Sequence, residues 1–210
     1  MKNTINEFDI KAAEWDKNPM HWDRSAAIAS EILENIPLKA SFKAMEFGSG
    51  TGILSFLLKD HVKEILLIDS SAEMIRLTNE KIASSGVKNL KTKFFDLEHS
   101  EPGHERFDFI FTQMALHHVS DIEGIIQKFH NMLNPGGYLA IADLYPEDGS
   151  FHGPEADVHK GFDINILSAL LMKQNFINIS SKECFVINRK VSDNETKRFP
   201  VFIIIGKSRD

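Results

Sequence analysis

A run of apolar residues that passes directly into three alternating glycines constrains this chain more than any other feature. Residues 44–47 read Ala-Met-Glu-Phe, and Gly48, Gly50 and Gly52 follow at every second position. Glycine lacks a Cβ, so the backbone can turn sharply there and let a ligand approach closely, while the helix start that follows offers unpaired N–H groups. The segment predicts a strand, a loop that holds a nucleotide-like ligand, and a helix.

The spacing of the glycines restricts the kind of ligand. A dinucleotide fingerprint reads Gly-x-Gly-x-x-Gly, whereas position 53 is Ile53 and the third glycine comes one residue early. Glu46 favours the same conclusion, because a carboxylate beside the loop would repel a pyrophosphate and favour a ligand with an ammonium group. The methionyl end of S-adenosylmethionine carries such a group.

Strand and helix signals follow the loop in a regular order. Residues 63–69 form an apolar run that ends in Asp69, about 20 residues beyond the loop, where a parallel strand would present a carboxylate to a ribose diol. A helix is expected over 70–85, with Ser70 or Ser71 as its cap. Further strands are expected over residues 90–95, 107–113 and 138–143, the last after a turn at 134–137.

Residues 43–143 resemble, in the order of these signals, the class I S-adenosylmethionine-dependent methyltransferases, whose first motif is an acidic residue followed by Gly-x-Gly-x-Gly. The resemblance implies an α/β fold with a Rossmann-like, doubly wound, seven-stranded sheet. This sheet would be mostly parallel, with a C-terminal antiparallel hairpin and helices on both faces. Residues 143–162 resemble more loosely a group of small methyltransferases similar to quinone-biosynthesis methylases, and this likeness names no acceptor.

The resemblance also implies a cofactor and the residues that hold it. S-adenosylmethionine would be the methyl donor and S-adenosylhomocysteine its product. Asp96 would bind the adenine amino group, and the next backbone N–H, that of Leu97, a ring nitrogen. The residues expected to contact the cofactor are Trp15, Glu46, Gly48, Ser49, Gly50, Gly52, Asp69, Ser70, Met74, Asp96, Leu97 and Gln113.

The segment ahead of the first strand, residues 1–40, is expected to form a helical lid on a single domain that spans 41–210. Its apolar spacing predicts helices over 6–16 and 24–35, the second capped by Asp23 and separated from the first by a polar and aromatic connector. In the family that this chain resembles, such helices often lie over the cofactor. A role in covering one face of the sheet is equally compatible with the sequence.

The chain beyond the fifth strand begins with an irregular stretch. Residues 144–161 are punctuated by glycine and proline, and a loop of this length in a compact domain is usually functional or mobile. A helix is expected over 163–174. Strands over 180–188 and 198–207, joined by a short polar segment, predict a terminal hairpin.

Adjacent histidines supply the candidates for a general base. His117 and His118 follow the strand that ends at Gln113, and an imidazole titrates near neutrality. We expect His118 to make a structural hydrogen bond and His117 to face the acceptor. His152, His159 or Asp143 could join them around a metal ion, but the spacing matches no standard zinc pattern, so the sequence predicts no metal site.

Composition narrows the partners. The net charge of −6 at pH 7 argues against a standing affinity for nucleic acid, and the chain lacks a run of about 18 apolar residues that could cross a bilayer. The single cysteine, Cys184, cannot form an intramolecular disulfide, so a cytoplasmic protein is expected, as a monomer or homodimer.

The sequence therefore predicts a methyltransferase that acts on a small molecule. Carbon, nitrogen, oxygen and sulfur acceptors remain equally compatible with it. Two other functions stay open: a sensor that binds S-adenosylmethionine or S-adenosylhomocysteine without catalysis, and an NAD-dependent oxidoreductase. The early third glycine and the terminal hairpin disfavour the oxidoreductase.

Overall fold

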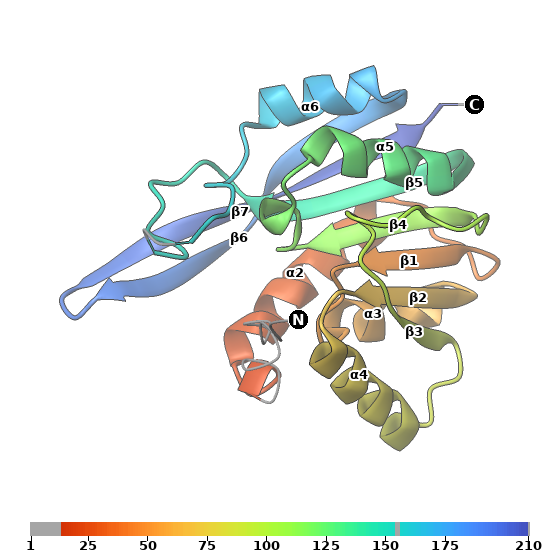
Figure 1. The fold of residues 1–210 in the computed structure, drawn as a ribbon, viewed down its shortest axis with the longest axis horizontal. Helices are drawn as coiled ribbons and strands as arrows, with labels where there is room; N and C mark the ends of the chain where they lie inside the picture. Colours follow the sequence, from red (N-terminus) through yellow and green to blue (C-terminus); the bar gives the residue numbers. More distant parts are fainter. Residues whose placement is uncertain (1–13, 154–155, 210) are drawn as a thin grey trace.

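A mixed sheet forms the centre of the structure, a computed structural model that describes residues 14–153 and 156–209 (Figure 1). Its strands are β1 (Lys43–Phe47), β2 (Glu64–Asp69), β3 (Leu90–Phe94), β4 (Phe107–Gln113), β5 (Leu133–Leu144), β6 (Phe176–Ser192) and β7 (Glu195–Ser208). They lie in the order β3-β2-β1-β4-β5-β7-β6. Strands β1 to β5 run parallel, whereas β7 is antiparallel to β5 and β6. The predicted seven-stranded fold with a terminal antiparallel hairpin is confirmed.

Helices cover both faces of the sheet because successive residues of the central strands point to opposite sides. Phe109 and Phe111 pack in one core cluster, and Ile110 between them packs in the other. The first face carries α2 (Pro19–Asn35), α3 (Ile53–Leu58) and α4 (Ala72–Ser85), and the second carries α5 (Ile122–Met132) and α6 (Ile164–Lys173). Two short 3-10 turns are η1 (Lys59–His61) and η2 (Leu116–His118). Among the described helices, none has the length and apolar character needed to span a membrane.

Helix α2 begins five residues before the predicted start at Arg24. Asn18, rather than Asp23, is its N-cap, and the Asn18 side chain accepts a hydrogen bond from the backbone N–H of Met20. Pro19 occupies the first turn, where its missing N–H is not needed and its fixed φ suits a helix. The expected connector therefore shrinks to residues 16–18. The helix predicted over 6–16 falls almost wholly outside the described residues.

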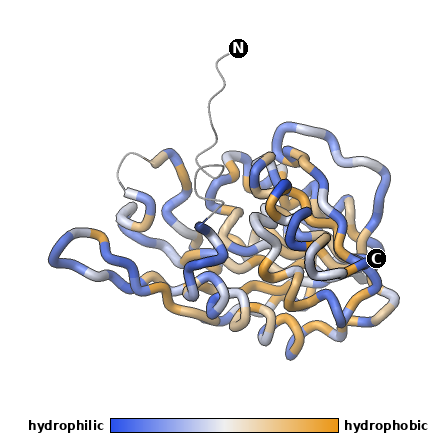
Figure 2. The backbone as a smooth tube through the Cα atoms, turned by 90° about the horizontal axis from the view of Figure 1, so that it is seen from below, coloured by the Kyte–Doolittle hydropathy of each residue, from blue (hydrophilic) through white to orange (hydrophobic). Residues whose placement is uncertain are grey.

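The terminal hairpin is longer than the sequence indicated. The polar segment 189–197, expected as a connector, pairs instead across β6 and β7, and only Asp193 and Asn194 lie between the strands. Polar side chains tolerate this position because the outer part of the hairpin needs only its own ladder of hydrogen bonds and packs on little core. It projects beyond the rest of the sheet (Figure 1), and its tip is hydrophilic (Figure 2).

Helix α2 is built into the core of the domain. Ile28, Ile32 and Ile36 are buried in the same cluster as Leu54 and Leu58 of α3, and α2 also contacts β6 and β7. The sequence left open whether this segment is a lid or a cover for the sheet. Its C-terminal half covers the sheet, while its N-terminal half reaches the edge where the strands β1 and β4 end.

This packing predicts a large difference between two neighbouring substitutions in α2. Ile32 is 0% exposed, so Ile32→Ala should lower the free energy of unfolding by about 2–5 kcal/mol through lost burial and a cavity. Leu33, which is 38% exposed, is the matched control, and Leu33→Ala should cost about 0.5 kcal/mol or less. Urea titration followed by circular dichroism measures both. Small and equal effects would show that α2 is a detachable cover.

Candidate functional site

The glycine loop lies where the strand order reverses, beside β1 and between β2 and β4. Open α/β sheets bind ligands at this position, outside the carboxyl ends of the strands. Gly48 has a φ of +63°, and a Cβ there would lie 2.4 Å from the Cβ of Ala115. Gly50 also has a positive φ, +52°. The backbone can follow this path only because these positions carry no side chain.

Asp69 holds the loop in place from the end of β2. One carboxylate oxygen accepts the backbone N–H of Gly50 at 2.7 Å, and the other accepts the N–H of Ser71 at 2.8 Å. The Ser71 side chain in turn caps α4, as predicted, by accepting the N–H of Met74. A single carboxylate thus joins the loop after β1 to the first turn of the helix after β2.

A cleft opens above this loop and contains the predicted cofactor residues except Glu46 and Gly52. The predicted residues that line it are Trp15, Gly48, Ser49, Gly50, Asp69, Ser70, Met74, Asp96, Leu97 and Gln113. The remaining lining residues were not predicted to contact the cofactor, although His118 was predicted as a candidate base: Arg24, Phe47, Ile68, Phe95, Glu98, Met114, Ala115, His118 and Val119. The cleft collects the ends of β1, β2 and β4 and the residues just after β3, as the sequence order implied.

Glu46 lies beneath the loop and does not line the cleft. Its side chain is fully buried, and one of its oxygens accepts a hydrogen bond from the hydroxyl of Ser55 in α3. Burial raises the pKa of Glu46 to about 8, so the group holds a proton at neutral pH. The direct attraction to a ligand ammonium that the sequence suggested is replaced by support of the loop from below. Gly52 likewise serves structure, as the N-cap of α3 with a φ of +75°.

Contacts that the sequence did not predict fasten the N-terminal segment over the cleft. Asp16 accepts hydrogen bonds from the Thr51 hydroxyl and from the Lys81 ammonium group, the latter at 2.7 Å. Farther along, the Ser25 hydroxyl donates to the side chain of Gln113 at 3.0 Å. All three contacts join segments distant in sequence, so no local pattern could have indicated them.

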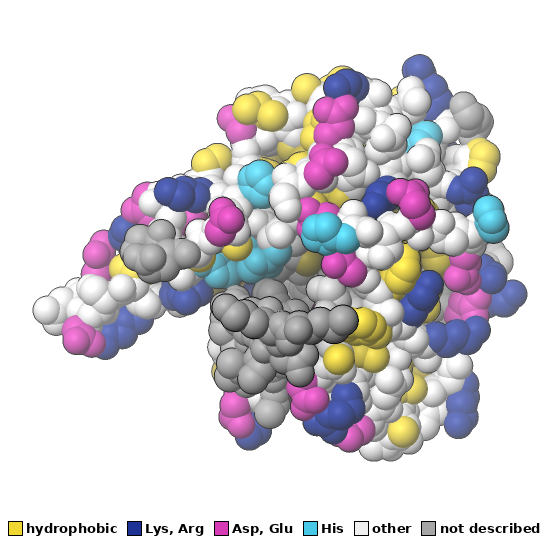
Figure 3. All heavy atoms as spheres, viewed as in Figure 1, with side chains coloured by type: hydrophobic (Ala, Val, Ile, Leu, Met, Phe, Trp, Pro, Cys, Tyr) yellow, Lys and Arg dark blue, Asp and Glu magenta, His cyan; other side chains and the backbone are white. Residues whose placement is uncertain are grey.

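A second cavity, of about 740 Å³, adjoins the cleft and shares with it Trp15, Arg24, Met114 and His118. Its other charged and histidine side chains are His21, His117, His152, Asp157, Arg189 and Lys190. Histidine side chains gather near the base of the β6–β7 hairpin on the face shown in Figure 3. The cavity is therefore predominantly basic. Its size lies within the range of small-molecule sites.

Arg24 is the main residue that the sequence interpretation missed. Its side chain, on a residue 5% exposed, lies at the junction of cleft and cavity, and its Nε has no hydrogen-bond partner. Burial lowers its pKa to about 10, although the nearby charge of Asp143 opposes this shift. A signal was present, because Arg24, Ile28 and Ile32 follow one another at intervals of four, so Arg24 places a charge on the apolar stripe of α2.

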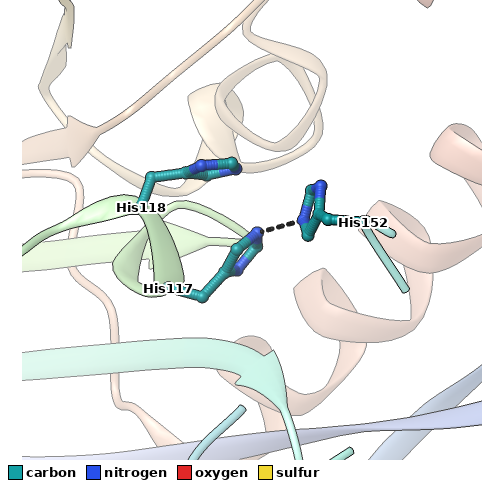
Figure 4. Close-up of side chains that lie close together, drawn as sticks. All are labelled: His117, His118 and His152. Atoms are coloured by element: carbon teal, nitrogen blue, oxygen red, sulfur yellow. Dashed lines mark hydrogen bonds between the residues drawn. The ribbon is translucent and has the colours of Figure 1, made fainter. Parts of the chain in front are cut away.

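The predicted base candidates occupy different environments. His117 is 1% exposed, and its Nδ1 lies 2.7 Å from the buried carboxylate of Asp143. Its Nε2 lies 2.9 Å from Nε2 of His152, which comes from the long loop (Figure 4). His118 lines both the cleft and the cavity. The sequence assigned the structural hydrogen bond to His118, whereas the geometry gives His117 a buried bond of that kind. His159 stays exposed, although its N–H donates to the His117 carbonyl.

A methyltransferase domain model matches residues 20–175, which include the whole cleft apart from Trp15. The chain belongs to the methyltransferase domain family. The family match spans β1 to β5 and ends at the start of β6. The predicted resemblance to class I methyltransferases is confirmed.

Known proteins similar to this methyltransferase domain differ in how much of it they share. An uncharacterized methyltransferase of Schizosaccharomyces pombe is 30% identical over 141 residues, which cover 62% of this chain but only 50% of that protein. The chain thus spans about half of that relative's length. An uncharacterized methyltransferase of Oceanobacillus iheyensis is 30% identical over 91% of this chain and 74% of its own. The N-methyltransferase NodS of Bradyrhizobium japonicum, solved with S-adenosylhomocysteine, shares the fold at a TM-score of 0.75 and 16% identity, with both chains fully covered.

Glu46 generates a pH-dependent prediction. The folded protein keeps a proton on Glu46 up to about pH 8, whereas the unfolded chain releases it near the ordinary pKa of 4.5. Stability should therefore fall as the pH rises through this window. Glu46→Gln, which cannot ionise, should remove this part of the slope and raise the melting temperature relative to the parent above pH 8. Scanning calorimetry at several pH values measures the pH dependence of the melting temperature, and Glu101→Gln, a change at an exposed residue, is the control. An unchanged slope in Glu46→Gln would contradict the assignment.

Proposed function

We propose that this chain is an S-adenosylmethionine-dependent methyltransferase that acts on a small molecule. The observation that carries the proposal is the junction of two cavities, since the cleft above the glycine loop opens directly onto the basic cavity. The cleft would hold the cofactor and the basic cavity the acceptor. S-adenosylhomocysteine would remain in the cleft after transfer.

Within the cleft, each end of the cofactor has candidate partners. Asp69 would bind the ribose diol while it holds the loop, and Asp96 with the Leu97 N–H would bind adenine. The glycine loop would face the methionyl end, with Gln113 and Trp15 near it. The ligand would thus extend from the end of β3 across β2 and β1 towards β4, as the lining residues are distributed.

Methyl transfer from a sulfonium is an in-line displacement with a neutral leaving group, so alignment supplies much of the catalysis. His118, Met114 and Arg24 border both cavities, and the methyl carbon would lie beside them. An acceptor hydroxyl or ammonium group must lose a proton during attack, which calls for a base. His117 and His118 remain our candidates for that role.

The charges of the second cavity favour an acceptor with an anionic group. Arg24 is buried with an unpartnered Nε, and Arg189 and Lys190 of β6 add positive charge, that of Lys190 being shared with Asp193 at 3.2 Å. A buried cation with spare donors is stabilised by an anion that binds to it. Asp157 is the single carboxylate among the described lining residues. We therefore propose a carboxylate- or phosphate-bearing acceptor.

We further propose that the protein acts in the cytoplasm, as a monomer or homodimer, without a nucleic-acid or membrane partner. The net charge of −6 supports this, because binding to phosphate backbones requires clustered positive charge. Burial raises the pKa of the Cys184 thiol to about 12, so this cysteine is a poor nucleophile and suits a structural role.

The proposal predicts binding of S-adenosylmethionine and S-adenosylhomocysteine in calorimetric titration, with negligible binding of NAD. Asp69→Ala should lower the affinity for both adenosyl ligands by roughly tenfold to a hundredfold, because a hydrogen bond to a charged group is worth about 1.5 to 3 kcal/mol. Asp96→Ala should act more mildly, since its carboxylate is 45% exposed.

Asp60→Ala is the matched control, because this exposed acid lies outside the cleft. Heat from NAD but none from the adenosyl ligands would overturn the cofactor assignment. Parental affinity in a folded Asp69→Ala variant would refute the assigned role of Asp69.

The acceptor class predicts where a labelled methyl group goes. Protein incubated with methyl-labelled S-adenosylmethionine and a metabolite extract should place label in low-mass compounds that an anion-exchange resin retains. Arg189→Met should reduce this incorporation by roughly tenfold, the effect of one lost charged hydrogen bond, whereas the exposed Arg198→Met should not. Cofactor binding without any transfer would favour the sensor, and transfer only to uncharged compounds would refute the anionic acceptor.

A further inference from the structure

Three histidines from two separate segments meet at the wall of the second cavity (Figure 4). His117 and His118 belong to η2, directly after β4, while His152 comes from the loop that follows β5. One ring nitrogen from each lies within 4.8 Å of the others, and the ring centroids are 4.2 to 5.1 Å apart. Within the described residues, no other group of three potential ligands comes as close.

Asp143 orients the first of these rings. Its carboxylate is fully buried and accepts hydrogen bonds from Nδ1 of His117 and from the backbone N–H groups of His117 and Leu144. Because a carboxylate only accepts, Nδ1 of His117 donates its proton to Asp143, which leaves Nε2, 2.9 Å from Nε2 of His152, as the candidate ligand atom of this ring. A histidine that donates its second N–H to a carboxylate is the usual arrangement of a metal-binding imidazole.

The long loop is shaped to deliver His152 to this place. Phe151, its neighbour, is 6% exposed and packs with its ring centroid 5.1 Å from that of Phe199 in β7. The guanidinium of Arg189 covers the same ring at 4.9 Å. Farther along the loop, the N–H of His159 donates to the carbonyl of His117 at 2.8 Å. The loop is therefore anchored on both sides of His152, which limits where its imidazole can go.

We propose that His117, His118 and His152 bind one divalent transition-metal ion of the zinc class. Imidazole nitrogens bind Zn²⁺ at 2.0–2.1 Å, so tetrahedral ligands lie about 3.3 Å apart. The His117 and His152 nitrogens, at 2.9 Å, are already closer than this, and the ligand nitrogens of all three rings lie within 4.8 Å, so binding would require side-chain rotations that bring them to the tetrahedral spacing. Three protein ligands leave the fourth position open, the pattern of catalytic rather than structural zinc sites.

The surrounding charges decide what occupies the fourth position. Arg24, Arg189 and Lys190 line the same cavity, and their positive charges work against a cation. Asp143 is buried beside His117 and close enough to Arg24 to affect its pKa, so its carboxylate offsets part of the positive charge of the ion and of Arg24. An anionic oxygen or sulfur atom bound to the ion would add a second negative charge. The site thus suits a metal ion that binds together with an anionic acceptor.

The chemical role of the ion rests on the proposed function and takes the place of the general base considered there, because His117 and His118 cannot accept a proton on a nitrogen that binds the ion. A hydroxyl or thiol of the acceptor bound at the open position would lose its proton to solvent more readily, because the metal would stabilise the conjugate base. The resulting anion would then attack the methyl carbon of S-adenosylmethionine. The new bond to the acceptor forms as the carbon–sulfur bond breaks, and the electron pair of that bond stays on sulfur in S-adenosylhomocysteine.

Metal binding itself can be tested without any acceptor. Protein freed of metal by a chelator is titrated with Zn²⁺ in a calorimeter and with Co²⁺ in a spectrophotometer, at about pH 7.5, where free imidazole is mostly neutral. We expect one equivalent of Zn²⁺ to bind. Co²⁺ should give the strong visible bands of a tetrahedral site, which Zn²⁺ then abolishes by displacement.

Two variants decide which residues hold the ion. His152→Gln, a change in the loop that leaves the buried His117–Asp143 pair intact, should weaken Zn²⁺ binding by more than roughly a hundredfold, since changes outside the ligand set alone cost ten- to a hundredfold. His118→Gln should also abolish the tetrahedral cobalt bands. His159→Gln is the matched control, because this histidine is exposed in the same loop and lies outside the cluster.

Two results would refute the proposed metal site. Absence of stoichiometric Zn²⁺ binding to the parent would refute it, as would equal losses in His152→Gln and His159→Gln. Melting temperature and calorimetric binding of S-adenosylmethionine, measured on the same samples, show that each variant is folded. Zn²⁺ binding without S-adenosylmethionine binding would instead retain the metal site and refute the proposed function.

Discussion

The reversal of strand order beside β1 is the constraint on which the rest of the molecule depends. The chain leaves β1 towards one face of the sheet and leaves β4 towards the other, so the two connections diverge and a crevice forms between them. Gly48 can lie in this crevice against Ala115 only because it has no side chain. The cleft lies in this crevice, and the second cavity and the histidine cluster adjoin it.

Three acidic residues at strand ends serve the crevice in different ways because their surroundings differ. Glu46, under the loop, has one bonded and one unpartnered oxygen, and burial favours its neutral form. Asp69 accepts hydrogen bonds from two backbone N–H groups and thereby fixes the loop. Asp143 accepts three N–H groups and lies near the charge of Arg24. Position in the sequence alone would have made the three look equivalent.

The sequence predicted what depends on short-range pattern. Apolar runs, glycine spacing and capping residues located the strands and α4 with its Ser71 cap, and together with the family resemblance they indicated part of the lining of the cleft. It failed where a contact joins distant segments. The position of His152 beside His117 depends on the burial of Phe151 against β7. The early start of α2 was missed for a local reason, because the Asn18 side chain accepts the backbone N–H of Met20 while Pro19 occupies the first turn. The extent of the hairpin was missed because strands that pair mainly with each other need no apolar alternation.

The projecting hairpin allows residues of the second cavity to change in evolution independently of residues of the cleft. Its residues Arg189 and Lys190 line the second cavity, yet no residue of the described β6 or β7 lines the cleft above the glycine loop. Beyond the sheet, the two strands pair chiefly with each other, so insertions or exchanges of residues there disturb little of the core. A lineage could therefore acquire a new acceptor by altering this arm while the half that holds the glycine loop stays as it is.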